Sequence, residues 1–346
     1  MKKISKQIIL SLIFLAILAV CLFYAQQQLI PFNDQDTNQT ATFYETEEDS
    51  VDVLTVGASS VMVSFSPLRL YENTGITSYV RCSSVQAPPV TYLNVKESLK
   101  TQKPKLVVVS AYTLLLEYDY DEYESWLRRG MDYKKLSIDK IKIAKAISDR
   151  SEWQTTSSFI FPILRYHARW KNILNGENHK EHLGEYDYMH GQFPVYKHKT
   201  IEDVSAEKMA ETELAPITDD NMYWYDKMIT LCKENDIQVL LLVTPDMRWT
   251  TGKHEALQQI ADKYDVQFLD FNVDDITAKC GIDWETDFYD NHHVNAPASI
   301  KVTDYLSDYI VDTYGFGPSD VSDSVKNQFE EDIVQFKKDL KEKKCQ

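Results

Sequence analysis

The chain lacks paired cysteines, a surplus of positive charge and an abundance of glycine or proline. With only 10 Gly and 11 Pro in 346 residues, and 43% hydrophobic residues, it is neither collagen-like nor disordered. Lys and Arg number 37 against 53 Asp and Glu, a net charge of −16. Because so acidic a surface repels phosphate backbones, nucleic-acid binding is not expected. No CxxC pair occurs among the five cysteines, which excludes a disulfide framework and a zinc ribbon.

One long uncharged apolar run is present, at residues 8–25. At 1.5 Å per residue it spans about 27 Å, enough for the hydrocarbon core of a membrane. The flank 1–7 is basic, so it is expected in the cytoplasm with the rest of the chain outside. Phe23-Tyr24-Ala25 is a poor cleavage site, which favours an uncleaved signal anchor over a cleaved signal peptide, an alternative that stays open. The sequence thus predicts a single-pass protein of the cell membrane with an extracellular C-terminal domain.

Four short, continuously apolar runs rich in branched residues follow, at 53–56, 106–109, 239–243 and 266–269. Such runs are typical of strands that are buried on both faces of a parallel sheet. Helical patterns lie between or after them, over 90–100, 219–234, 252–264 and 297–313. This alternation predicts βαβ units and therefore a three-layer α/β sandwich.

The other segments indicate how the chain is divided. Residues 26–50 are polar and increasingly acidic, and are expected to form a stalk that holds the domain off the membrane. The domain covers 51–313 and is interrupted at about 118–218 by an insertion or cap rich in Tyr, Trp and His. Residues 314–346 repeat apolar residues at helical spacing, which predicts an amphipathic helix that docks on the domain or on a partner.

A serine follows the first predicted strand directly, in the segment GASS at 57–60. Ligands of open parallel sheets bind beyond the carboxyl ends of the strands, so this turn is a natural site. Ser59 can present its hydroxyl there, and backbone amides that follow it, such as that of Ser60, could stabilise an oxyanion. The simpler alternative is that Ser59 or Ser60 only caps the next helix.

A carboxylate and an imidazole three residues apart precede the last predicted helix, in the segment DNHHVN at 290–295. The spacing lets Asp290 bind one ring nitrogen of His293 while the other nitrogen points into the site. With Ser59 they would make a Ser-His-Asp set, in which His293 takes the serine proton and Asp290 orients the imidazole. His292 could compete for either role, and Asp287 could replace Asp290.

These two segments resemble the first and last sequence blocks of the SGNH (GDSL-type) hydrolases. LTVGASSVMVSFSPLRLYENTGITSY, KPKLVVVSAYTL and RYHARW are more closely similar to membrane-anchored SGNH-like proteins of Gram-positive bacteria. Those relatives include proteins like the D-alanylation factor of the Dlt system and alginate-acetylation-type transferases. The resemblance covers most of 51–313 and implies a mostly parallel, flavodoxin-like sheet. It also implies that Ser59 is the nucleophile, Asp290 the orienting acid and His293 the base.

The chain departs from the family where the oxyanion is bound. The middle blocks of the superfamily supply a Gly and an Asn for this purpose, whereas no GxND follows the strand that reads VVVSAYTL. Donors besides the Ser59 amide are therefore sought at Ser84 or Gln86. Loss of one such donor typically costs 10²–10³-fold in rate. Weak or narrowly directed hydrolysis, or acyl transfer to a held sugar hydroxyl, is the expected consequence.

Two functions of different class remain in view. The first is an esterase or O-acyltransferase that moves acetyl or alanyl groups on a cell-envelope polysaccharide. For this function, the resemblance to the membrane-anchored SGNH-like proteins implies a multi-pass membrane O-acyltransferase as partner. The second is a catalytically silent, anchored protein that binds glycan or assists assembly. No cofactor is expected. No metal site is expected either, because the histidines of the polar loop are predicted to be solvated: His179, His182, His190 and His198.

Overall fold

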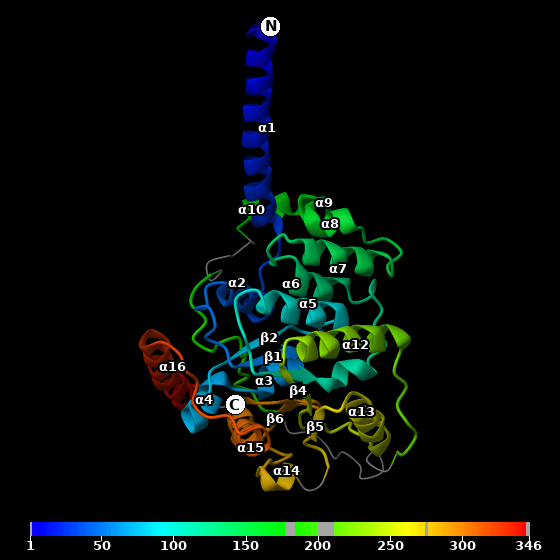
Figure 1. Cartoon of the computed structure of the whole chain (residues 1–346), viewed down its shortest axis with the longest axis vertical. Coiled ribbons are helices and arrows are strands. Elements are labelled where there is room, and N and C mark those ends of the chain that lie inside the picture. The colour runs from blue at the N-terminus through cyan, green and yellow to red at the C-terminus, as the bar shows by residue number, and fades with distance from the viewer. Residues whose placement is uncertain (1, 177–183, 200–210, 274–275, 344–346) are drawn as a thin grey trace.

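The computed structural model describes residues 2–176, 184–199, 211–273 and 276–343. A five-stranded, entirely parallel sheet in the order β2-β1-β3-β4-β5 forms its centre (Figure 1). The strands are β1 (Val53–Gly57), β2 (Ser78–Cys82), β3 (Leu106–Ser110), β4 (Gln238–Val243) and β5 (Gln267–Asp270). This order is that of flavodoxin-like sheets, so the predicted α/β fold with a parallel, flavodoxin-like sheet is confirmed.

Helices cover both faces of the sheet, because successive strand residues point to opposite sides. Val53, Val108 and Leu240 pack against α3 (Ser59–Ser64), α4 (Pro67–Thr74) and α15 (Ala296–Tyr314). Leu54 and Leu241 pack against α5 (Pro88–Ser98), α12 (Asp219–Glu234) and α13 (Thr251–Tyr264) on the other face. The helices predicted over 90–100, 219–234, 252–264 and 297–313 are therefore present, with small shifts at their ends.

The sequence analysis missed β2 and a short hairpin, β6 (Phe288–Asp290) and β7 (His293–Val294). β2 reads SYVRC and is fully buried although it contains a charge. Arg81 lies 3.4 Å from Glu97 of α5 and over the ring of Phe43. A buried ion pair replaces the apolar pattern that marks the other strands, and no local rule detects it.

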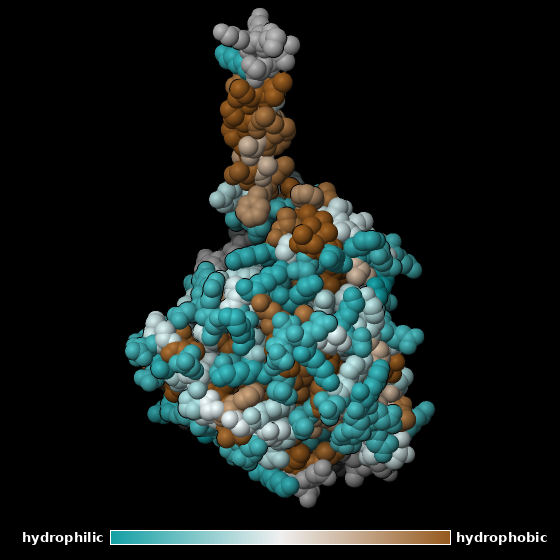
Figure 2. Space-filling view, viewed as in Figure 1, coloured by the Kyte–Doolittle hydropathy of each residue, from teal (hydrophilic) through white to brown (hydrophobic). Residues whose placement is uncertain are grey.

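A long helix, α1 (Lys2–Leu29), projects from the body at the N-terminus (Figure 1). Within its segment Lys6–Leu29, the most apolar 18-residue stretch has a mean hydropathy of 2.9, and none of that stretch is buried, whereas Leu29 at the end of the helix is buried against the body. Figure 2 shows the projecting helix as a largely hydrophobic column above a mixed surface. By length and composition this helix could cross a membrane, in agreement with the span predicted at 8–25.

The predicted stalk over 26–50 is wrong, because these residues pack into the domain. They form a π-helical turn (Asp34–Asn38) and α2 (Gln39–Phe43), and several of their polar side chains are buried. Asp36 accepts hydrogen bonds from both the amide and the hydroxyl of Ser84, and lies 3.3 Å from Arg129. The sequence analysis took the polar residues of this segment to be solvated, because their hydrogen-bond and ion-pair partners lie far along the chain.

The insertion contributes helices to the outside of the α5 layer. They are the 3₁₀ turn η2 (Ala111–Leu115) just before it, α6 (Glu124–Met131), α7 (Ile138–Ser148), α8 (Thr156–Ile160), α9 (Ile163–Tyr166), η3 (His167–Arg169) and α10 (Trp170–Leu174). Leu127, Ile143 and Phe159 pack against Val90 and Leu93 of α5. The predicted histidines His179 and His182 lie outside the described residues.

The C-terminal helix α16 (Asp323–Glu342) docks on its own domain, beside α4, whereas the short α14 (Ile276–Lys279) lies at the far end of the body (Figure 1). Phe329 and Phe336 pack against Leu68 and Met189. His190 is buried there and forms a 2.9 Å hydrogen bond with Asp332 of α16. The prediction that His190 is solvated is therefore wrong, whereas His198 is exposed as expected.

The turn between β1 and α3 predicts a strong effect of Gly57→Ala. Gly57 has a φ of +131°, and an added Cβ would come within 2.4 Å of the Cβ of Ser110. We expect a loss of about 2–4 kcal/mol in the free energy of unfolding, measured by denaturant titration, from strain and overpacking together. Gly317→Ala is the control, because nothing lies within 4 Å of its added Cβ. Equal stability of the two variants would contradict this account of the turn.

Candidate active site

Ser59 stands at the carboxyl end of β1, where it opens α3. Gly57 accepts a hydrogen bond from the amide of Ser83, which ties the end of β1 to the end of β2. The close approach of Gly57 to Ser110 lets the chain turn sharply from strand to helix. As the first residue of the helix, Ser59 has a backbone amide with no partner inside the helix. The turn therefore offers both a hydroxyl and a free amide at one edge of the sheet.

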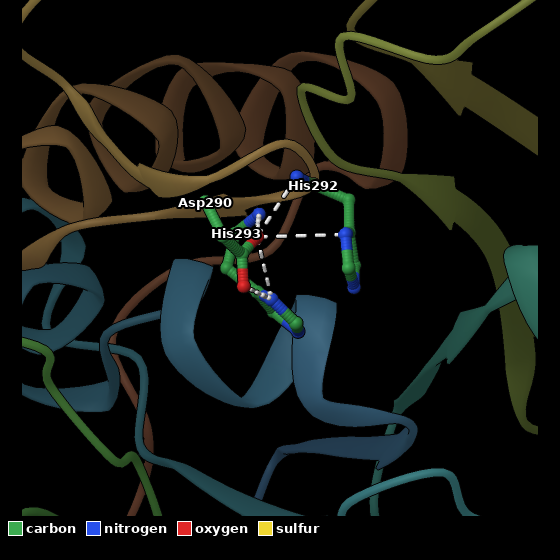
Figure 3. Close-up of side chains that lie close together, drawn as sticks. All are labelled: Asp290, His292 and His293. Atoms are coloured by element: carbon green, nitrogen blue, oxygen red, sulfur yellow. Dashed lines mark hydrogen bonds and ion pairs between the residues drawn. The ribbon is translucent and has the colours of Figure 1, made fainter. Parts of the chain in front are cut away.

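The hairpin β6–β7 brings His293 to this serine. The Nε2 atom of His293 lies 2.8 Å from the hydroxyl oxygen of Ser59, and its Nδ1 atom lies 2.8 and 3.0 Å from the carboxylate oxygens of Asp290. Figure 3 shows the His293 ring between Asp290 and the helix α3. Asp290 also accepts the amides of His292 and His293 at 2.9 Å, which fixes the turn that carries it. The three predicted residues are thus linked by hydrogen bonds in the expected order.

The hairpin is held from two sides. On one side, the amide of Met247, just after β4, donates to the carbonyl of Asn291 at the hairpin tip. On the other, Asn295 caps α15 through the amide of Ala298 and donates to the carbonyl of Thr286. These contacts anchor the hairpin, so the position of the His293 imidazole is fixed relative to the sheet.

Asp287, the alternative to Asp290 as the partner of His293, forms contacts with other residues instead. It is buried, binds Lys301 of α15 at 2.6 Å and accepts the amide of Asp283. Its carboxylate supports the loop before the hairpin, so the geometry favours Asp290 as the partner of His293.

His292 lies close to the pair but is placed less well. Its Nδ1 atom lies 3.4 Å from Asp290, farther than the Nδ1 atom of His293, and its ring contacts that of His293 in a tilted arrangement with centroids 4.0 Å apart. Burial and the neighbouring His293 lower the pKa of His292 to about 4. Burial raises the pKa of Asp290, but the hydrogen bond and charge of His293 outweigh it and lower the pKa to about 2. At neutral pH the site therefore holds an ionised Asp290 and an uncharged His292.

The side chains of the predicted oxyanion and substrate residues have partners other than Ser59. The hydroxyl of Ser60 lies 3.5 Å from that of Ser110, and Ser84 donates both its amide and its hydroxyl to Asp36. The Gln86 amide is buried among Ser83, Thr91 and Asn94. The backbone amides of Ser59 and Ser60, both in the first turn of α3, remain as donors from the predicted set.

A cation beside the site was missed by the sequence analysis. Arg248 follows β4 in the segment TPDMRW, bonds the hydroxyl of Tyr112, and acts electrostatically on His292. Its Nε atom is buried without a hydrogen-bond partner among the described residues, and the carboxylate of Asp246 lies 3.7 Å away. The position of Arg248 in the sequence, shortly after a predicted strand, could have indicated this cation. The carboxyl ends of parallel strands meet at one edge of the sheet, where the site lies.

The same cluster could also hold a metal ion. Donor atoms of Asp290, His292 and His293 lie within 4.8 Å of one another, a set found in the part of the chain that the structure describes. A metal bound to the Nδ1 atom of His293 would displace the proton that joins it to Asp290. Metal binding and a Ser-His-Asp relay therefore exclude each other at this site.

Comparisons with known proteins add little to this geometry. No family model and no curated protein matches the chain. One similar solved structure is described as a "putative acylhydrolase" from Bacteroides fragilis. It is 13% identical, the alignment covers 82% of this chain and 99% of that chain, and the TM-score is 0.37. So loose a likeness assigns neither fold nor activity, and the candidate site rests on its own geometry.

The low pKa of His292 predicts a pH effect on stability. Because the imidazole binds a proton more tightly in the unfolded chain, at a pKa of about 6.5, acidification from pH 6.5 towards 4 favours unfolding. His292→Asn removes this contribution, so its melting temperature should fall less between pH 7 and 5 than that of the wild type. Asp290, whose low pKa favours the folded state, loses its contribution only below about pH 4.

The matched control is His198→Asn, at an exposed histidine. It should retain the wild-type slope of melting temperature against pH. An unchanged slope in His292→Asn as well would contradict the burial of a neutral imidazole at this position.

Proposed function

We propose that this protein is a serine-dependent esterase or acyltransferase that acts on O-acyl groups, acetyl or alanyl, of a cell-envelope polysaccharide. The observation that carries the proposal is the continuous chain of hydrogen bonds from Ser59 through His293 to Asp290. A hydroxyl, an imidazole and a carboxylate in this order are what nucleophilic acyl transfer requires.

The proposed reaction has two halves. The Nε2 atom of His293 accepts the Ser59 proton while the serine oxygen attacks the acyl carbonyl carbon, and the imidazolium then protonates the departing alcohol. In the second half, water or a sugar hydroxyl gives its proton to His293 and attacks the acyl-serine, which restores the hydroxyl of Ser59. Asp290 stays ionised throughout and stabilises the imidazolium. Neither half requires a cofactor.

The scarcity of oxyanion donors argues for transfer to a bound acceptor rather than rapid hydrolysis. The amides of Ser59 and Ser60 are the donors proposed for the developing oxyanion, whereas Ser84, the further donor sought from the sequence, is committed to Asp36. One missing donor costs roughly 10²–10³-fold in rate. An acceptor hydroxyl held close to the acyl-serine recovers part of this loss through proximity. Arg248, beside His292, is placed to bind polar groups of such an acceptor.

The proposed location follows from α1. With the basic flank 1–7 in the cytoplasm and α1 across the membrane, the domain lies outside the cell, where envelope glycans are found. A multi-pass membrane O-acyltransferase is the proposed partner, as the supplier of acyl groups to a site on this side of the membrane.

A second function has one specific observation in its favour. Ser84 and Gln86 are both bonded to other groups in the domain, so the site has fewer oxyanion donors than a fast esterase needs. A catalytically silent protein that holds glycan beside Ser59 would have no need of these donors. Turnover by the purified protein separates the two functions.

The relay predicts that losses at its members do not add. Ser59→Ala and His293→Ala should each lower the hydrolysis of nitrophenyl acetate by roughly 10³-fold or more, and the double variant should be no slower than either. Asp290→Asn should keep the fold and cause a large but smaller loss, because it favours the wrong imidazole tautomer. The full-length chain in detergent is the material for this assay.

His292→Ala is the matched control and should retain most of the activity, because His293 makes the shorter bonds to Asp290. An inactive His292→Ala beside an active His293→Ala would reverse the assignment. Full turnover in Ser59→Ala would overturn the mechanism.

The proposed topology predicts where the two ends of the chain can be reached. An antibody should bind a peptide tag fused after Gln346 on intact cells, and a tag fused before Met1 only after permeabilisation. Binding in the opposite pattern would contradict an extracellular domain.

A further inference from the structure

The last turn of α1 is surrounded by the short helices of the insertion. Leu29 and Ile30 form an apolar cluster with Tyr166, Ile163 and Ile173, which belong to α9 and α10. The guanidinium of Arg169 donates to the carbonyl of Leu29 at 2.6 Å. The insertion is therefore fixed around the point where the chain leaves the hydrophobic helix (Figure 1).

Several large apolar side chains of these helices are exposed among basic ones. Phe161, Leu164, Trp170 and Leu174 each have more than half of their surface open to solvent. Figure 2 shows hydrophobic surface over α8 and α9, next to the base of the projecting helix. Large apolar side chains gathered in this way on one face are unfavourable in water and mark an interaction surface.

The charge of the segment differs from that of the rest of the chain. Residues 153–176 contain Arg165, Arg169 and Lys171 and no acidic residue, although the whole chain has a net charge of −16. Arg165 forms an ion pair with Glu124, so Arg169 and Lys171 carry the basic charge of the segment. A segment that combines Trp, Leu and Phe with basic residues is typical of helices that lie in the interface of an anionic membrane. Trp is enriched at that depth because its ring is apolar and its N–H is polar.

The height of the segment above the hydrocarbon agrees with this chemistry. Leu29 is four residues beyond Ala25, the end of the uncharged run, so it lies about 6 Å further along the helix axis. The headgroup region on each side of a bilayer is about 5–8 Å thick. Helices that pack on Leu29 and Ile30 therefore lie at headgroup depth when α1 spans the membrane.

From these observations we infer that α8–α10 form an interfacial membrane-binding surface, with Phe161, Leu164, Trp170 and Leu174 inserted among anionic lipids around the protein's own anchor. An integral membrane protein is the competing occupant. Lipid is favoured because the surface surrounds α1 itself and carries Arg169 and Lys171, which an anionic leaflet attracts. The surface also holds the domain in one orientation towards the membrane.

The test uses the full chain reconstituted in vesicles of phosphatidylglycerol brominated on its acyl chains, which quenches Trp fluorescence by contact. Trp170→Phe should lose a substantial part of the quenchable fluorescence of the wild type. Trp284→Phe is the matched control, because Trp284 is exposed but lies between α14 and β6, at the end of the body away from α1. Its removal should leave the quenchable fluorescence unchanged.

Because lipid is the one other component in these vesicles, the result separates lipid from a protein partner. Equal quenchable fluorescence in the wild type and Trp170→Phe would overturn the inference and assign the surface to a protein. A second variant, Phe161→Ser/Leu164→Ser, should reduce quenching of the remaining Trp170, and unchanged quenching would also overturn it. Brominated phosphatidylcholine should quench Trp170 less than the anionic lipid, and equal quenching would contradict the preference for anionic lipid.

Discussion

One hydrogen bond, from the hydroxyl of Ser59 to Nε2 of His293, joins two segments that are 234 residues apart, and the whole site depends on it. Hydrogen bonds weaken steeply with distance and angle, so both segments must be held rigidly. The close packing of Gly57 on Ser110 fixes the first, and the bond from Met247 to Asn291 fixes the second. The parallel sheet supplies the common edge at which both are anchored.

The connection between the apolar helix α1 and the domain is a packed segment rather than a flexible linker. From α1 the chain passes directly into the buried turn that contains Asp36, which binds Ser84 at the end of β2 and Arg129 of the insertion. The domain is thereby attached to its anchor through the same edge of the sheet that carries Ser59. Together with the interfacial contact proposed for α8–α10, this geometry places Ser59 at a set height above the proposed membrane surface.

The sequence was most informative where a structural element depends on its own residues. Four strands coincide with mainly apolar runs, and α12 was predicted with its observed bounds because its apolar residues repeat at helical spacing. The Asp-x-x-His spacing likewise depends on one turn of chain, and it predicted the contact between Asp290 and His293. The sequence analysis did not predict the elements that depend on distant partners. β2 requires the Arg81–Glu97 pair, and the packing of residues 26–50 requires Ser84 and Arg129. The same dependence explains why Ser84 resembled a free donor, since its acceptor Asp36 lies 48 residues away.

The central claim is that His293 and Asp290 activate Ser59 as a nucleophile. Its most direct test is reaction of the full-length protein with a fluorophosphonate, followed by peptide mass mapping of the adduct. The relay predicts a single adduct on Ser59 that is lost in His293→Ala and retained in His292→Ala. An adduct on a different serine, or no adduct on a folded wild-type protein, would contradict it.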